Sequence, residues 1–253
     1  MPNYFAPKQA AARYARGRFF YQPQIMACLR DRLPLNFPVA CAVDVACGTG
    51  NSTLALVELA TQVIGVDPSA EMLSLAVEDE HITYRVGPAE HLPIDDGACE
   101  LMTIASAFHW MDHAAALAEA HRVLRVGGWL AIYDNLFAAQ MRDRPDFTAW
   151  YQQVYQPAFP GPAKPHADFF DNPTVTQGLR FIELVTVEGE QSFTRDSFIG
   201  YLTSVSSTQV AIQNGRPIEE IESWLRAELA PFFAGLPTAT FQFRRPIWLL
   251  THP

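Results

Sequence analysis

The first half of the chain alternates between short apolar runs and segments with helical spacing. Five apolar, β-branched stretches predict buried strands, over residues 39–45, 62–67, 82–86, 99–105 and 129–133. The intervening spacing predicts helices over residues 51–60, 69–80 and 112–125. Asp112 is the expected N-cap of the last helix, and Gly127 is expected at its C-terminal cap. Strands that alternate with helices predict a parallel, doubly wound sheet.

The second half differs, because aromatic residues and prolines gather in residues 135–171. We expect a helix over 146–156 and then a loop, inserted after the fifth strand as the roof of a pocket. The remaining segments predict an extended stretch, two helices and a strand, over residues 181–193, 196–206, 217–233 and 240–250. Gly189 favours a turn in the extended stretch, and Pro246 favours an edge position or a bulge in the strand.

Charge is distributed unevenly along the 253 residues, whose formal net charge is −9. Residues 1–38 carry +5, so the remainder carries −14. An acidic body repels a phosphate backbone, and we therefore expect no nucleic-acid partner. The basic leader either faces a small anion or is a solvated helix face.

Targeting and redox features are sparse in this sequence. No uncharged apolar run approaches the roughly 20 residues that a membrane span needs. Met1 to Arg18 lacks the apolar core of a secretory signal. The cysteines form no CxxC pair, which argues against a zinc site or a disulfide framework. These features predict a cytoplasmic protein without a membrane partner.

The most informative segment follows the first predicted strand and reads Ala46-Cys47-Gly48-Thr49-Gly50-Asn51. Glycines at such a place let the backbone approach a ligand at the N-terminus of the next helix. Seventeen residues beyond Gly50, the second strand ends in Asp67, whose carboxylate can accept hydrogen bonds from both hydroxyls of a ribose. The combination predicts an adenosine-type ligand.

Three details distinguish between adenosine cofactors. A dinucleotide fingerprint requires G-x-G-x-x-G, and here its first and last glycines are absent. No Lys-Ser/Thr pair follows the loop, which excludes a P-loop. Asp44, just before the loop, would repel a pyrophosphate but could hold an ammonium group. This set favours S-adenosylmethionine over a nicotinamide dinucleotide.

Five segments in order resemble the class I S-adenosylmethionine-dependent methyltransferases: DVACGTGNS, IGVDPSAEML, GPAEHLP, ASAFHWMD and HRVLRVGG. The FHW tripeptide and the leader YARGRFFYQPQI are similar to the small-molecule group that includes trans-aconitate methyltransferase. The strong resemblance covers residues 10–134, whereas TSVSS and PIWLL match more loosely. The resemblance implies an α/β Rossmann-like sheet of seven strands, mostly parallel with an antiparallel last strand, and an inserted helical, aromatic cap.

The resemblance also implies one methyltransferase domain over residues 1–253. Within it we expect N-terminal lid helices over 1–38 and a cofactor-binding core over 39–134. A substrate cap insert is expected over 135–178. C-terminal strands and helices over 179–253 would complete the sheet and the pocket.

Roles in cofactor binding carry over to matching positions. The implied contacts are Tyr14, Arg18, Asp44, Ala46, Gly48, Gly50, Asp67, Pro68, Met72, Ala89, Glu90 and Ser106. Two positions depart from the family pattern, which usually has glycine at Ala46 and aspartate at Pro88. Two alternatives follow for the adenine amino group: either Glu90 accepts from it, or this contact is absent.

Methyl transfer requires an aligned nucleophile, exclusion of water and, for a hydroxyl or carbon acid, removal of a proton. His109 is the main candidate for a general base, and Tyr21 is the second. Alternatively, Phe108-His109-Trp110 has a purely structural role, because an ionised carboxylate needs no base. We expect substrate contacts from aromatic residues, namely Trp110, Tyr133, Trp150 and Tyr151. Arg16 or Arg18 could pair with an anion.

The sequence thus predicts an enzyme that transfers a methyl group from S-adenosylmethionine to a small molecule and releases S-adenosylhomocysteine. A carboxylate or hydroxyl oxygen is the expected acceptor. No metal is expected, because Ser106-Ala107-Phe108 supplies no acidic ligand to accompany Asp134. Two alternatives stay open: a C-methyltransferase of the quinone-biosynthesis type, and a non-catalytic S-adenosylmethionine-binding module.

Overall fold

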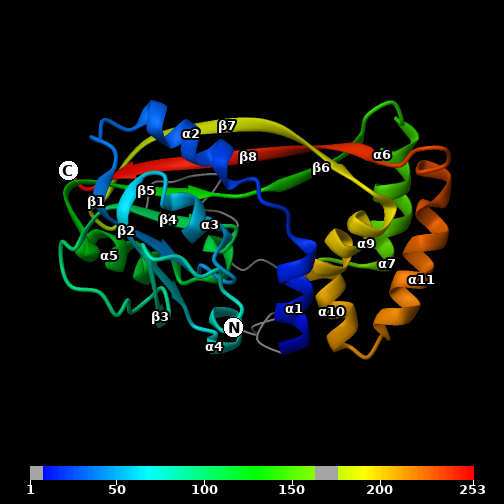
Figure 1. The fold of residues 1–253 in the computed structure, drawn as a ribbon, viewed down its shortest axis with the longest axis horizontal. Helices are drawn as coiled ribbons and strands as arrows, with labels where there is room; N and C mark the ends of the chain where they lie inside the picture. The colour runs from blue at the N-terminus through cyan, green and yellow to red at the C-terminus, as the bar shows by residue number, and fades with distance from the viewer. Residues whose placement is uncertain (1–7, 163–175) are drawn as a thin grey trace. The chain divides into compact units, whose positions relative to one another are not determined.

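A computed structural model describes residues 8–162 and 176–253, and the chain divides into two compact units (Figure 1). The first, which we call the sheet unit, consists of Phe20–Asp134, Lys164–Val187 and Arg245–Pro253. The second, which we call the aromatic unit, consists of Met1–Phe19, Asn135–Ala163 and Glu188–Arg244. Both units are therefore assembled from segments that are distant in the sequence.

The strands of the sheet unit confirm the doubly wound arrangement. Their spatial order is β3 (Ile82–Val86), β2 (Ala60–Asp67), β1 (Val39–Val45), β4 (Cys99–Ala105), β5 (Leu124–Tyr133) and β8 (Ala239–Thr251). Neighbours from β3 to β5 are parallel, and β8 pairs antiparallel with β5 through its residues 247–251. All five strands predicted in the first half are present, and the last strand is antiparallel as expected.

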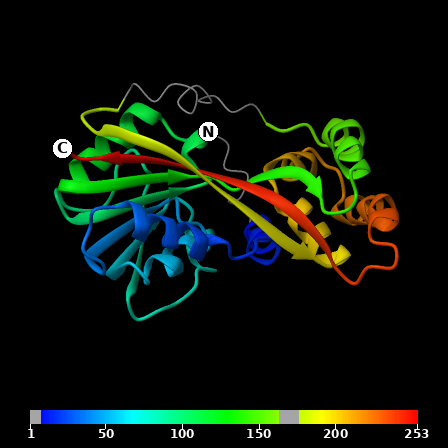
Figure 2. The same cartoon turned by 90° about the horizontal axis from the view of Figure 1, so that it is seen from above.

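Side chains alternate between the two faces of this sheet, and helices cover both faces (Figure 2). On one face, α2 (Gln22–Arg32) and α3 (Asn51–Leu56) share a core with strand residues that include Val63, Leu101 and Ala131. On the other face, α5 (His113–Val123) shares a core with Val43, Met102 and Ile132. Burial on both sides explains why these strands read as continuous apolar runs.

Helix ends in the sheet unit differ from several predictions. Helix α3 ends at Leu56. Helix α4 covers only Ala70–Leu73, because further along the chain the N–H of Val77 bonds to the carbonyl of Thr49 instead of continuing the helix. Asp112 caps α5 as predicted, since its side chain accepts from Ala115 N–H. The position predicted for Gly127 is wrong. Helix α5 ends at Val123 and β5 begins at once, so Gly127, at φ 80°, lies inside that strand.

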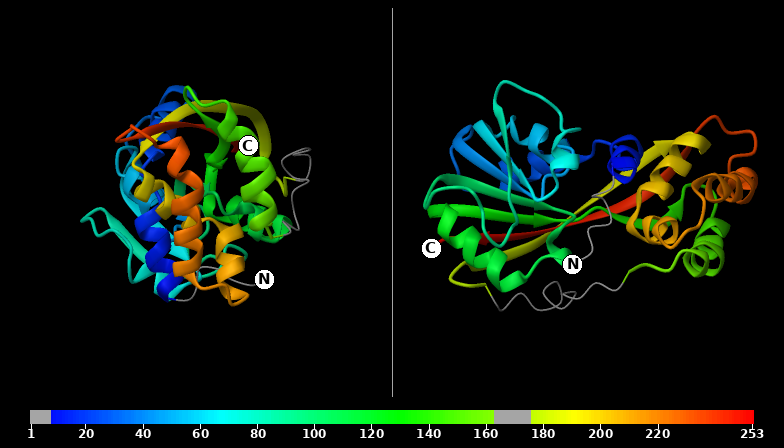
Figure 3. Two further views of the ribbon diagram at one scale, coloured as in Figure 1. Left: turned by 90° about the vertical axis from the view of Figure 1, so that its right-hand side faces the viewer. Right: turned by 90° about the horizontal axis from the view of Figure 1, so that it is seen from below.

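The aromatic unit combines helices with three paired strand segments (Figure 3). Its elements are α1 (Lys8–Gly17), β6 (Leu136–Met141), α6 (Asp146–Trp150), the π-helical turn η2 (Tyr151–Tyr155), α7 (Gln156–Ala158), part of β7 (Arg180–Phe193), α9 (Arg195–Ser204), α10 (Ser206–Gln213), α11 (Ile218–Leu229), the 3-10 turn η3 (Ala230–Phe232) and part of β8. Residues 163–171 of the predicted aromatic insert lie outside the described residues.

Three predictions for the second half are corrected by this arrangement. The predicted insert begins with a strand, β6, and not with a helix or loop. This strand pairs antiparallel with β8, and Phe137 lies opposite Phe243 in that pairing. No turn occurs at Gly189, since β7 continues through that residue as a partner of β8. Pro246 lies in a strand paired on both sides, not at an edge. It falls between the β6 ladder, which ends at Arg244, and the β5 ladder, which begins at Ile247. Its carbonyl accepts the N–H of Asp134 over 3.1 Å, and the only N–H lost on this side is the one that a proline cannot return.

Aromatic side chains form the core of the aromatic unit. Phe147, Phe198 and Phe241 are fully buried. The rings of Phe198 and Phe241 stack with centroids 4.0 Å apart and an interplanar angle of 8°. Within the described residues, no helix combines the length and apolar character required to cross a bilayer.

Candidate functional site

The glycine segment forms a tight loop between β1 and α3. Ala46, Gly48 and Gly50 all have positive φ, at 54°, 57° and 82°. A Cβ on Gly50 would overlap the hydroxyl of Tyr84, which itself donates to the carbonyl of Val77 over 2.8 Å. Only glycine combines this backbone conformation with this close approach. The loop therefore has a bare backbone at the carboxyl end of β1.

The end of β2 is bonded directly to this loop. The N–H of Gly48 donates to Oδ2 of Asp67 over 2.9 Å, and the N–H of Ser69 donates to Oδ1 over 2.8 Å. Burial raises the pKa of Asp67, while these two N–H groups act in the opposite direction. The structure thus places the predicted ribose acceptor against the predicted glycine loop.

Asp44 lies beneath the loop and is fully buried. The hydroxyls of Thr53 and Thr103 donate to its two oxygens over 2.7 and 2.8 Å. Burial raises the pKa of Asp44 to about 6; these hydroxyls lower the pKa, and the charge of Asp67 raises it further. Sequence reasoning missed both threonines. Thr103 is the β4 partner of Asp44 in the parallel ladder, and that register cannot be read from the sequence.

A second polar cluster lies at the carboxyl ends of β4 and β5. Ser106, with φ 52°, donates from Oγ to Oδ1 of Asp134 over 2.8 Å. Nδ1 of His109 lies 3.9 Å from Oδ2 of the same carboxylate. His109 is buried in the 3-10 turn η1 (Phe108–Trp110). The structure therefore pairs the predicted base with Asp134, which the sequence singled out only for metal binding.

The other predicted cofactor residues of the sheet unit differ in their burial and in the contacts that they already make. Met72 and Ala89 are buried, whereas Pro68 is exposed. A Cβ on Gly48 would lie 3.0 Å from Cε of Met72, which places this side chain against the loop. Glu90 accepts the N–H of Asp112 over 3.0 Å, so one of its oxygens is already bonded at the start of α5.

The predicted substrate and lid residues are divided between the units. In the sheet unit, Tyr133 bonds to Ser52 Oγ, and the ring of Tyr21 lies edge-on to Tyr133 at 6.5 Å. Trp110 also belongs to the sheet unit, with its ring 4.8 Å from that of His109. Tyr14, Arg18, Trp150 and Tyr151 belong to the aromatic unit. The indole N–H of Trp150 bonds to Glu228, which is a structural contact.

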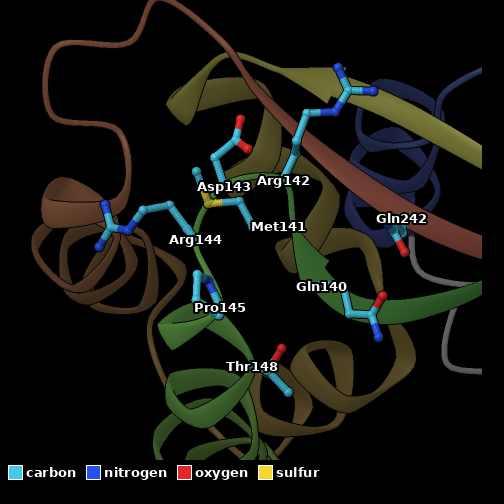
Figure 4. A pocket seen from close by; sticks show the side chains of 8 residues that line it. All are labelled: Gln140, Met141, Arg142, Asp143, Arg144, Pro145, Thr148 and Gln242. Atoms are coloured by element: carbon cyan, nitrogen blue, oxygen red, sulfur yellow. The ribbon is translucent and has the colours of Figure 1, made fainter.

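A depression of about 400 Å³ occurs in the aromatic unit (Figure 4). It is lined by Gln140, Met141, Arg142, Asp143, Arg144, Pro145, Thr148 and Gln242. Arg142 pairs with Glu190 and Arg144 with Asp146, and Figure 4 shows the two guanidinium groups pointing away from each other. None of the predicted site residues lines this depression, and its charges do not converge.

The loop can be tested for fit to an adenosine cofactor with a cationic centre. The loop carries no side chain at Gly48 and Gly50, and Asp67 supplies an acceptor beside it. Asp44 contributes negative charge beneath the loop, and no lysine or arginine stands between residues 33 and 84 to neutralise a phosphate. This donor set fits S-adenosylmethionine. In the described part of the chain, no group of three His, Cys, Asp or Glu side chains could hold a metal ion.

A family of methyltransferase domains matches residues 43–132, which include the loop, Asp67 and His109. The match covers the glycine loop and the strands around it, and the mostly parallel sheet with one antiparallel strand accompanies it.

Known proteins of this kind show similarity of differing extent. An uncharacterized methyltransferase of Mycobacterium tuberculosis is 37% identical over 129 residues, which are 50% of each chain. The present chain thus spans about half the length of that relative. An uncharacterized methyltransferase of Schizosaccharomyces pombe is 27% identical over 92% of this chain and 88% of its own.

One solved structure and one shorter match add to these relatives. A chain from Anaeromyxobacter dehalogenans assigned to the type II methyltransferases has a TM-score of 0.69 and 25% identity, over 92% of this chain and 96% of its own. A ubiquinone/menaquinone biosynthesis C-methyltransferase of Rubrivivax gelatinosus is 35% identical over 38% of this chain and 44% of its own.

Proposed function

We propose that the whole chain is an enzyme that transfers a methyl group from S-adenosylmethionine to a carboxylate or hydroxyl oxygen of a small molecule. The observation that carries this proposal is the bond between Gly48 N–H and Asp67, which joins the glycine loop to the acceptor at the end of β2. The match to a methyltransferase domain over residues 43–132 supports it. The proposed similarity to the trans-aconitate group rests on the FHW and leader segments alone.

Several residues of this chain would hold the cofactor. The backbone at Ala46, Gly48 and Gly50 would contact its methionine part, and Asp67 would accept from the ribose. Asp44, fully buried below the loop, would favour a cationic centre electrostatically. When bound, S-adenosylmethionine supplies a methyl group on a positively charged sulfur, which leaves as a neutral thioether once an acceptor oxygen has taken the methyl.

His109 has different tasks for the two acceptor types. A hydroxyl must lose its proton as it reacts, and an imidazole of His109 held near Asp134 could take that proton. A carboxylate is already ionised, so His109 would then only shape the site. Replacing His109 by Gln should lower kcat by about 100-fold or more with a hydroxyl acceptor and by less than about threefold with a carboxylate acceptor.

Isothermal titration with S-adenosylhomocysteine tests cofactor binding directly. We expect micromolar binding by the unmodified protein and a loss of about tenfold or more in affinity, about 1.4 kcal/mol, for Asp67→Ala. Asp95→Ala is the matched control, because Asp95 is an exposed acid elsewhere in the sheet unit. Absence of binding by the unmodified protein would contradict the proposal.

The Rubrivivax match favours a second candidate, methyl transfer to a carbon of a quinone precursor. The two candidates differ in the bond formed. Methyl-labelled S-adenosylmethionine, incubated with the protein and either small carboxylic acids or demethylated quinones, separates a carboxylate acceptor from a carbon acceptor: methyl esters are cleaved by mild base, whereas C-methyl products are not. Tight cofactor binding without transfer to either class would indicate a binding module.

A further inference from the structure

Strand β7 forms an edge of the sheet in the described part of the chain. It runs from Arg180 to Phe193, and β8 is the one strand with which it pairs there (Figure 1). Among the same described residues, no backbone hydrogen bond outside the strand ladders involves residues 181–190. One side of β7 therefore offers a row of N–H and C=O groups with which a further strand can pair.

The features that usually protect such an edge are sparse in the middle of β7. The strand contains no proline and no lysine, and its residues 184–187 read Leu-Val-Thr-Val, without a charge. Ile182 and Leu184 are 40% and 50% exposed, and they share one face because they are two residues apart. Charged residues or prolines normally keep a segment of this kind from pairing with other chains. We therefore expect the edge to be covered in the native protein.

Opposite charges stand on the two sides of this apolar middle. Arg180 and Glu188 are both exposed, and each lies four residues from Leu184 along the strand. Because successive side chains alternate between the faces, both charges share the face of Leu184. Arg180 belongs to no ion pair within the described residues, and the pair of Glu188 with Arg244 joins two strongly exposed side chains. The order positive, apolar, negative is complementary to its own reverse.

Antiparallel pairing of two copies of β7 about a two-fold axis at Leu184 would use this complementarity. Arg180 of each copy would lie opposite Glu188 of the other, once at either end of the pairing. Between these ends, Ile182 would lie opposite Thr186, and the two copies of Leu184 would lie opposite each other. Apolar pairs and pairs of opposite charge that face each other directly stabilise antiparallel strands.

The two neighbouring registers fit less well. An axis at Glu183 would place two glutamates directly opposite each other, which is destabilising. An axis at Val185 would place the apolar side chain of Ile182 opposite Glu188. Of these three registers, the one centred on Leu184 matches both the charges and the apolar side chains.

We propose that the protein forms a dimer in which β7 pairs antiparallel with β7 of a second copy, centred on Leu184. The interface is isologous, because both copies contribute the same residues, and the assembly closes after two chains. It joins the sheets of the two copies and removes the open edge from each. The proposal does not depend on the proposed function, because it uses no residue of the expected cofactor site.

The size of the pairing sets the expected affinity. About nine residues a side take part, compared with the roughly 20–30 residues a side of a standard interface. We therefore expect a weak dimer, with a dissociation constant of about 10 μM. A dimer of this strength is monomeric at low micromolar concentration, so its assembly can be followed by dilution.

Sedimentation velocity of the full chain between about 1 and 200 μM, at about 150 mM salt, tests the proposal. The unmodified protein should change from monomer to dimer over this range. Leu184→Lys places two like charges opposite each other at the axis and should raise the dissociation constant by about tenfold or more. Val126→Lys is the matched control, because Val126 is 74% exposed on β5, and it should change the dissociation constant less than about twofold. Thermal melts verify that both variants are folded.

Charge reversal tests the register. Arg180→Glu alone and Glu188→Arg alone should each raise the dissociation constant by about tenfold, because like charges then meet at both ends. A mixture of these two single variants should pair as a heterodimer, since opposite charges meet again, and the double variant should pair with itself. Arg244→Gln controls for the ion pair that Glu188→Arg breaks, and it should change the dissociation constant less than about twofold.

Four outcomes would overturn the proposal. The first is a monomer at every concentration up to about 200 μM. The second is a dimer that Leu184→Lys does not weaken, because its interface would then lie elsewhere. The third is failure of the two charge-reversed variants to pair when mixed, which would contradict the register. The fourth is the formation of large aggregates instead of dimers, abolished by Leu184→Lys, because the edge would then be open and not closed by one partner.

Discussion

The two units bury their residues in different ways. In the sheet unit, aliphatic side chains alternate between the faces of parallel strands, and the polar groups gather where the strands end. In the aromatic unit, stacked rings fill the core, and the buried polar groups belong to helices and a π-helical turn. The difference shows that one unit holds a backbone loop in a fixed conformation, whereas the other is held together by contacts between aromatic rings.

The contrast suggests a division of tasks under the proposed function. Under that proposal, the glycine loop and Asp67 would bind the cofactor, which requires a backbone held in one conformation. An acceptor molecule differs from enzyme to enzyme, and helices can exchange side chains without disturbing a sheet. Variants in the two units should therefore affect stability and cofactor binding in separable ways.

The largest effect is expected from Phe198→Ala in the aromatic unit. Removal of this buried ring leaves a cavity beside Phe241 and should lower the free energy of unfolding by about 3–5 kcal/mol. Leu236→Ala, at a side chain that is 48% exposed, should lower it by less than about 0.5 kcal/mol. Urea denaturation measures both. If Phe198→Ala also abolished S-adenosylhomocysteine binding below the unfolding transition, the separation of tasks would fail.

The next effect concerns the loop of the sheet unit. Gly50→Ala combines a left-handed backbone with an overlap against Tyr84 and should cost about 3 kcal/mol of stability. Gly97→Ala has a similar φ of 63° but no atom within 4 Å of the new Cβ, so it should cost only about 1 kcal/mol. Only the first variant should also weaken cofactor binding. Equal losses in both variants would show that backbone conformation alone explains the requirement for glycine.

Asp44 provides a pH-dependent effect. Its pKa is raised to about 6 in the folded state, so between about pH 4 and pH 6 the folded protein binds more protons than the unfolded chain. This carboxyl therefore makes the protein less stable as the pH rises through that window, by about 2–3 kcal/mol. Asp44→Asn should remove this contribution to the pH dependence of the free energy of unfolding, which denaturation curves recorded at several pH values between pH 4 and pH 7 measure. If the variant showed the same pH dependence of unfolding free energy as the unmodified protein, Asp44 would be ionised in the folded protein over this whole pH range.

The smallest effect is expected at Ala46, an L-residue with φ 54°. Ala46→Gly should relieve the left-handed strain and, after the greater flexibility of glycine in the unfolded chain is included, stabilise the protein by about 0.5 kcal/mol. Ala42→Gly, in the buried β1 strand, should destabilise it instead by about 1 kcal/mol. Thermal melts of the two variants should therefore shift in opposite directions.

The sequence predicted the sheet unit better than the aromatic unit for a physical reason. Strands buried on both faces are continuous apolar runs, and the loop required glycine at Gly48 and Gly50, so both were visible in local patterns. The contacts of Asp44 with Thr103 and of His109 with Asp134 depend on register between distant strands, and no local pattern reports register. In the aromatic unit, β6 and α10 were missed because ring packing determines their conformation and aromatic residues suit several structures.

Strand order has a consequence for synthesis of the chain. β5 is complete at Tyr133, but its antiparallel neighbour consists of residues 247–251, so more than 100 further residues must be made before that edge is paired. During this interval the nascent sheet has an exposed, largely apolar edge, which is a site for pairing with other chains. A ribosome that stalls before residue 247 would release a product prone to aggregate. Chaperone dependence should therefore be highest while residues 135–246 are being translated.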